Sequence, residues 1–219
     1  MFVNPRWRVA TALVVLALCA WTASRGWAIV RFSHARASMT SQNERANAVA
    51  PWLAVSGIAG AAREAALTNA EPNDIDSVRK RGDEIAAILS VRPISSINWL
   101  ALASLRLFAG RPPDDVLGAL AMSSLTGPNE GQALAQRGIF GLWQWENLPS
   151  RVGAQLVSGL AGAILARATS DQERATMERM LAAKSAQARR EIADVFRAAG
   201  LSAADLGRLG LQSQGAASP

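Results

Sequence analysis

The residue types that carry most enzyme and metal chemistry are scarce in this chain. Its 219 residues include one cysteine, Cys19, and one histidine, His34. Cys19 lies inside an apolar run and His34 lies among arginines after that run, so the two do not form a nucleophile–base couple. One cysteine allows no disulfide within the chain, and no His, Asp and Glu cluster has the spacing of zinc ligands. We therefore expect neither a metal nor a cofactor.

The carboxylate pairs point to structure rather than to catalysis. Asp83-Glu84 and Asp114-Asp115 are adjacent in sequence, so on a helix their side chains diverge instead of meeting at one substrate bond. Asp114 and Asp115 also follow two prolines, a pattern typical of the first turn of a helix. The sequence therefore predicts a protein that is not an enzyme. The enzyme alternative would require a polar pocket with converging carboxylates.

The remaining candidates are tryptophan and arginine side chains within apolar segments, both enriched at the energetic centres of protein interfaces. Arg106 alternatively pairs with Asp114 or Asp115, or stacks on an indole. Trp143 and Trp145 are alternatively core residues. The five residues that we select as possible partner contacts are Trp99, Arg106, Arg137, Trp143 and Trp145.

The distribution of charge separates an N-terminal segment from the rest of the chain. The net charge is +6, but five arginines and no acidic residue precede residue 37, while the remaining 18 basic residues face 17 acidic ones. A nucleic-acid-binding domain would concentrate positive charge on its folded surface. Basic residues that flank an apolar run are typical of a membrane segment.

Residues 1–36 are predicted to form a membrane anchor with basic flanks. Residues 9–24 carry no charge and would form a helix of about 24 Å. Residues 26–30 extend this stretch towards the bilayer core thickness of about 30 Å. A cleaved signal peptide is the alternative, which the bulky Trp21 and the continuing apolar residues disfavour. We expect one uncleaved span in the bacterial inner membrane.

Residues 37–210 are predicted to form a helical-hairpin domain, because Ala-rich and Leu-rich segments alternate with short Pro/Gly turns and no segment alternates like a strand. Capping boxes at Ser41–Glu44 and Ser170–Glu173 start helices, and the second helix is expected to continue to Gly200. Gly127-Pro128 is expected to end a helix with a C′ glycine and a proline. Residues 211–219 are expected to be a disordered tail.

The spacing of two prolines suggests a repeat. Pro93 and Pro128 lie 35 positions apart, close to the 34-residue period of tetratricopeptide hairpins. The helix between them resembles the first helix of that repeat at Trp99, Leu102 and Ala103. We therefore expect an all-α fold, in which the N-terminal transmembrane helix precedes a tetratricopeptide-like array of antiparallel helix hairpins. An irregular all-α domain is the alternative.

Residues 89–149 resemble a second group, the small single-span bacterial accessory proteins of exopolysaccharide biosynthesis. The matching features are Pro93, Trp99-Leu100-Ala101, Gly110, Gly127-Pro128-Asn129-Glu130 and a Trp-rich end, Trp143-Gln-Trp-Glu-Asn-Leu-Pro149. The resemblance implies a scaffold that contacts envelope or polysaccharide-assembly proteins, with one membrane span and no nucleic acid. A general tetratricopeptide-like adaptor for secretion or division is the alternative.

The orientation of the anchor can be tested directly. A short N-terminal tail before a large domain favours a periplasmic domain, whereas the arginines after the apolar run favour a cytoplasmic one. We expect the periplasmic orientation. A periplasm-dependent reporter fused after Pro219 should then be active, and a cytoplasm-dependent reporter at the same position inactive. The reverse pattern would show that the domain is cytoplasmic.

Overall fold

The computed structural model describes residues 5–37, 49–53, 55, 59–66 and 74–211. These residues contain helices and turns and no strand, which confirms the all-α prediction. The backbone contacts divide the chain into two units. The first holds residues 1–72 and 90–92, and the second holds residues 73–89 and 93–219.

The first unit contains one long helix, α1 (Pro5–Ala37), a 3-10 turn, η1 (Ala50–Trp52), and a short helix, α3 (Ala59–Ala66). By length and composition, the segment Ala12–His34 of α1 can cross a membrane. Its 23 residues correspond to about 35 Å of helix. At the end of this segment Phe32 is buried with Val49 and Ala62.

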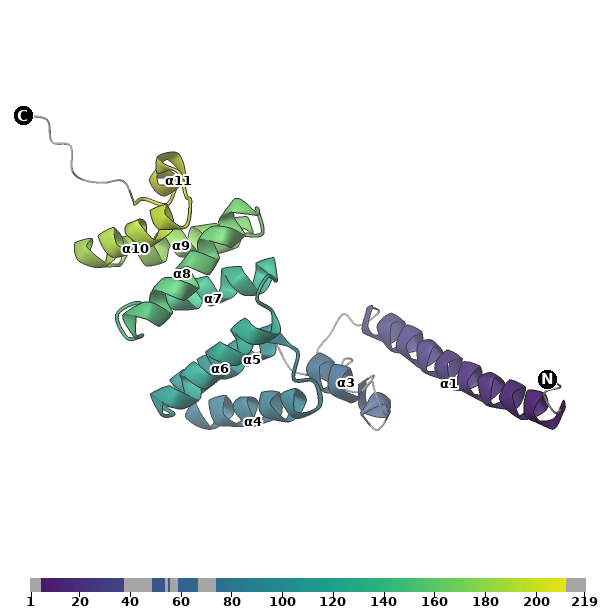
Figure 1. The fold of residues 1–219 in the computed structure, drawn as a ribbon. Helices are drawn as coiled ribbons and strands as arrows, with labels where there is room; N and C mark the ends of the chain where they lie inside the picture. Colours follow the sequence, from purple (N-terminus) through teal and green to yellow (C-terminus); the bar gives the residue numbers. More distant parts are fainter. Residues whose placement is uncertain (1–4, 38–48, 54, 56–58, 67–73, 212–219) are drawn as a thin grey trace, which may run out of the picture. The chain divides into compact units, whose positions relative to one another are not determined.

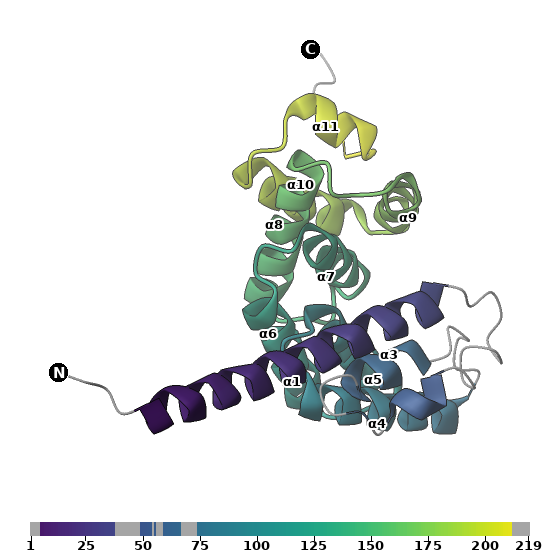
Figure 2. The same ribbon diagram turned by 90° about the vertical axis from the view of Figure 1, so that its right-hand side faces the viewer.

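The second unit is built from eight helices within the described residues (Figures 1 and 2). They are α4 (Ile75–Val91), α5 (Ser96–Phe108), α6 (Pro113–Thr126), α7 (Gly131–Trp143), α8 (Ser150–Leu165), α9 (Asp171–Ala182), α10 (Ala186–Ala198) and α11 (Ala203–Arg208). Helix α6 packs back along α5, and α8 packs back along α7. Helix α7 also contacts α5 and α9, and α8 contacts α10.

Two groups of buried side chains hold α5 to α11 together. One joins α5 and α6 to α7 and α8 through residues such as Leu100, Leu120, Phe140 and Leu156. The other joins α7 and α8 to the last three helices and includes Phe196. Both groups share α7 and α8, so this pair connects the two ends of the unit.

Hydroxyl caps set several helix starts. The predicted capping box at Ser170–Glu173 is confirmed. The Ser170 hydroxyl accepts from the Glu173 backbone N–H, and the Glu173 carboxylate accepts from the Ser170 backbone N–H. The single long helix that we expected after it is wrong. The chain breaks between α9 and α10, where the Ser185 hydroxyl accepts from the Ala188 N–H at 3.1 Å and starts a new helix.

The predicted tail and the first capping box have different outcomes. Leu211 is buried at 4% exposure and belongs to the core, so the ordered domain includes this residue. Residues 212–219 and the Ser41–Glu44 box lie outside the described residues.

Glycines allow α7 and α8 to approach closely. A Cβ added at Gly138 would lie 2.2 Å from the Leu160 Cβ and 3.0 Å from its Cα. One turn later, a Cβ at Gly141 would lie 2.8 Å from the Leu156 Cβ. Real Cβ atoms do not approach so closely, and the Leu160 backbone cannot rotate away. The contact therefore requires a residue without a side chain at Gly138.

We predict that Gly138→Ala destabilises the protein by about 1–3 kcal/mol, because the added methyl group forces α7 and α8 apart. Gly162→Ala is the matched control, since Gly162 lies on an exposed face of α8 with nothing near its Cβ position. The control should gain about 0.5–1 kcal/mol from its higher helix propensity. Urea unfolding followed by circular dichroism measures both, and equal effects would contradict the proposed close contact.

Candidate functional site

The residues that could take part in catalysis or metal binding do not converge in the described part of the chain. Cys19 and His34 lie exposed on α1. Asp114 and Asp115 occupy the first turn of α6, as predicted, and Asp115 pairs with Arg111 at 3.4 Å. Among the described residues, no group of three or more His, Cys, Asp and Glu side chains could hold a metal ion.

Arg106 links helices α5 and α6. Its Nη1 donates to the main-chain oxygen of Asp115 at 2.9 Å, and its side chain is half-buried. The partner is thus the Asp115 backbone rather than the carboxylate that the sequence suggested. This bond holds the end of α5 against the first turn of α6.

Arg137 is buried within the fold, with 3% of its surface exposed. Its Nη1 donates to the Ser123 main-chain oxygen at 2.8 Å and its Nη2 to the Gly127 main-chain oxygen at 2.9 Å. These carbonyls belong to the end of α6, where positive charge is favourable, and the Ser123 oxygen also accepts from the Gly127 backbone N–H at 3.3 Å. Burial lowers the pKa of Arg137 and Glu130 raises it, but a guanidinium stays protonated. The side chain selected as a partner contact therefore lies inside the domain.

The hydrogen bonds around Arg137 continue to the start of α5. The Ser123 hydroxyl donates to the Ser96 main-chain oxygen at 2.7 Å, and the Ser96 hydroxyl donates to Glu130. Gly127 packs against Ser96, and a Cβ added at Gly127 would lie 2.6 Å from the Ser96 Cβ. Its φ of −144° is not the left-handed conformation of a C′ glycine. The glycine predicted from turn chemistry is therefore required by close packing instead.

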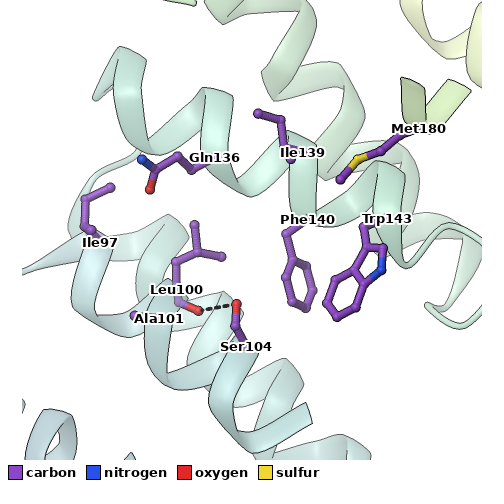
Figure 3. A pocket seen from close by; sticks show the side chains of 9 residues that line it. All are labelled: Ile97, Leu100, Ala101, Ser104, Gln136, Ile139, Phe140, Trp143 and Met180. Atoms are coloured by element: carbon purple, nitrogen blue, oxygen red, sulfur yellow. Dashed lines mark hydrogen bonds between the residues drawn. The ribbon is translucent and has the colours of Figure 1, made fainter. Parts of the chain in front are cut away.

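An apolar groove crosses α5, α7 and α9 (Figure 3). It has a volume of about 300 Å³. Its walls carry no charged side chain, and Ser104 and Gln136 supply the only polar side chains among the residues that line it. Those residues are Ile97, Leu100, Ala101, Ser104, Gln136, Ile139, Phe140, Trp143 and Met180. Ser104 already donates to the Leu100 carbonyl oxygen at 3.1 Å.

An aromatic cluster stands at one end of this groove. The Trp143 ring lies 5.2 Å from the Phe108 ring and 5.9 Å from the Phe140 ring, measured between centroids. Phe108 is 59% exposed and Trp143 is 37% exposed. Water therefore contacts these two aromatic side chains where α5 and α7 end. Exposed apolar surfaces are characteristic of interaction sites when they are contiguous.

The five residues selected from the sequence thus occupy different environments. Only Trp143 lies in the groove. Trp99 packs on the core, and its Nε1 donates to the Pro93 carbonyl oxygen at 2.7 Å. Trp145 is half-buried, and its Nε1 donates to Glu191 at 3.2 Å.

Several groove residues were missed in the sequence. Among the α5 residues in the groove, Ile97, Ala101 and Ser104 lie on one face, and exposed Phe108 continues their spacing. This i, i+4, i+7, i+11 pattern marks one face of a helix, so it was available as a signal. Met180 had no such signal, because it reaches the groove only through the packing of α9 on α7.

The chain matches no family model, no curated protein and no solved structure.

We predict that Arg137→Met destabilises the protein by roughly 2–4 kcal/mol, because the Ser123 and Gly127 carbonyls lose their charged donor inside the domain. Arg179→Met on α9 is the control. Arg179 is exposed and bonds only to its own helix, at Ala175 and Thr176. The control should change stability by less than about 0.5 kcal/mol. Urea unfolding of both variants provides the measurement, and native stability in Arg137→Met would contradict the assigned role.

Proposed function

We propose that this protein is a membrane-anchored, non-catalytic scaffold in the assembly or export of a bacterial surface polysaccharide. The polysaccharide context comes from the resemblance of residues 89–149 described above. The observation that best supports a scaffold role is the apolar groove with its exposed aromatic end at Phe108 and Trp143. The N-terminal helix α1 would hold the domain at the inner membrane, with the domain in the periplasm.

The arrangement of α5, α7 and α9 supports a tetratricopeptide-like stacking of the helices. Helices α5 and α7 each begin a packed pair, with α6 and α8, and α7 contacts both α5 and α9. In tetratricopeptide arrays, helix pairs stack so that each unit contacts its neighbours and an extended binding surface results. The residues that line the groove come from α5, α7 and α9 alone.

The chemistry of the groove favours a protein segment with an apolar face. A charged ligand would find no opposite charge among the residues that line the groove. An amphipathic helix buries its apolar side chains in such a groove through anchors at i, i+3, i+4 and i+7. Trp143 has the residue type and the partial exposure of an energetic centre of binding. We therefore propose that an envelope partner contributes a helix to this surface.

Purification of the full chain in native detergent tests this function. We expect a polysaccharide-assembly protein to be recovered with the native chain and lost with Trp143→Ala, because truncation of a central tryptophan costs about 2 kcal/mol or more of binding free energy. Leu125→Ala is the matched control, since Leu125 is 73% exposed on α6 and lies outside the groove.

The identity of the partner separates the two functions. Recovery of secretion or division proteins, lost with Trp143→Ala, would support the adaptor function and exclude the polysaccharide role. Equal recovery with the native chain and Trp143→Ala would exclude the groove as the binding surface. Unfolding curves of both variants identify any loss that is caused by misfolding.

A further inference from the structure

A second pocket lies between the α7–α8 connection and α10, and the scaffold function above does not use it. Its volume is about 370 Å³. Unlike the groove, its walls combine apolar and hydrogen-bonding groups. The apolar part includes Trp145 and Leu148, and the polar part includes Glu146, Ser150, Gln187 and Glu191.

Glu191 is held in position by neutral donors. The Trp145 Nε1 donates to its Oε2 at 3.2 Å, and the Gln187 amide donates to its Oε1 at 3.0 Å. A carboxylate has about four acceptor sites on its two oxygens. Each oxygen of Glu191 therefore keeps acceptor capacity after these two bonds, and the carboxylate is already oriented.

Glu146 is instead neutralised. The Lys184 ammonium group donates to its carboxylate and also to the Trp143 main-chain oxygen, the second at 3.2 Å. The hydrogen bond from Lys184 holds the pKa of Glu146 below its usual value. The pocket thus combines one paired carboxylate with one carboxylate that accepts only from neutral groups.

These groups discriminate between classes of ligand. An anion would face two carboxylates, and an apolar molecule would strip water from Glu191 without replacing its hydrogen bonds. A cation would find only the Glu191 carboxylate to pair with, because Glu146 is already paired with Lys184. A hydroxyl group both donates and accepts, so it can pair with the carboxylates and with the amide.

We propose that this pocket binds a neutral saccharide. Its hydroxyl groups donate to the free acceptor sites of Glu191, and its C–H surface packs against Trp145 and Leu148. The choice of a saccharide among polyhydroxyl ligands rests on the proposed function in surface-polysaccharide assembly. The site is separate from the groove, because the two share no lining residue. The scaffold would thereby contact the polymer as well as its protein partner.

The indole N–H of Trp145 reports directly on this pocket. The chain has seven tryptophans, so full-length protein labelled with ¹⁵N-tryptophan gives a small set of indole signals. Phospholipid nanodiscs replace maltoside detergents, because these detergents carry sugars themselves. Trp145→Phe assigns the signal by its loss. The probes are cellotriose, maltotriose and mannotriose as neutral saccharides, arginine amide as a cation and glucuronate as an anion.

We expect at least one neutral trisaccharide to shift the Trp145 signal saturably. Glu191→Gln should weaken this binding about tenfold or more, whereas Glu178→Gln, an exposed carboxamide substitution on α9 outside the pocket, should leave it unchanged. The other indole signals check that each variant is folded. Trp143→Ala should keep the saccharide response, so failure of the groove and failure of this pocket are distinguishable.

Three results would overturn the proposal. The first is the absence of any shift with all three trisaccharides. The second is a stronger response to arginine amide or to glucuronate than to the neutral probes. The third is native affinity in Glu191→Gln.

Discussion

The second unit depends on one buried cation. The Arg137 guanidinium on α7 donates to two carbonyl oxygens at the end of α6, and the Ser123 hydroxyl continues this connection to the start of α5. Three helices and one turn therefore meet at a single set of hydrogen bonds. Burial of an arginine is unfavourable unless its donors are used, and here the carbonyl oxygens at the end of α6 accept from them. The same bonds set the position of α7 relative to α5.

The groove is a consequence of that position. The groove runs between α5 and α7, and the glycine contacts bring α8 against the opposite side of α7. Because α8 covers one face of α7, the face with Gln136, Ile139 and Trp143 remains for the groove. The proposed function would follow from this division: one face of α7 stabilises the domain, and the other would receive the partner.

Two chemically different surfaces therefore arise near one short segment. Trp143 belongs to the apolar groove, and Trp145 belongs to the polar pocket beside α10. Lys184 contacts both residue 143 and residue 146 and fixes the connection between them. A scaffold with these two surfaces would hold an apolar protein segment and a polar ligand at separate places. The change in chemistry follows from the end of α7 at Trp143, after which successive side chains no longer share a helical face.

Local patterns in the sequence determined the helical class, the apolar N-terminal segment and several helix starts. Each of these depends on neighbouring residues: a run without charge, a serine with its capping partner, or a proline after a glycine. The roles of Arg137 and Gly127 were decided by tertiary structure, because their partners come from other helices and carry no signal at a fixed spacing. The same holds for the contributions of Met180 and Glu191 to the two pockets. Side chains that meet only after α9 and α10 have packed cannot be paired from the order of residues alone.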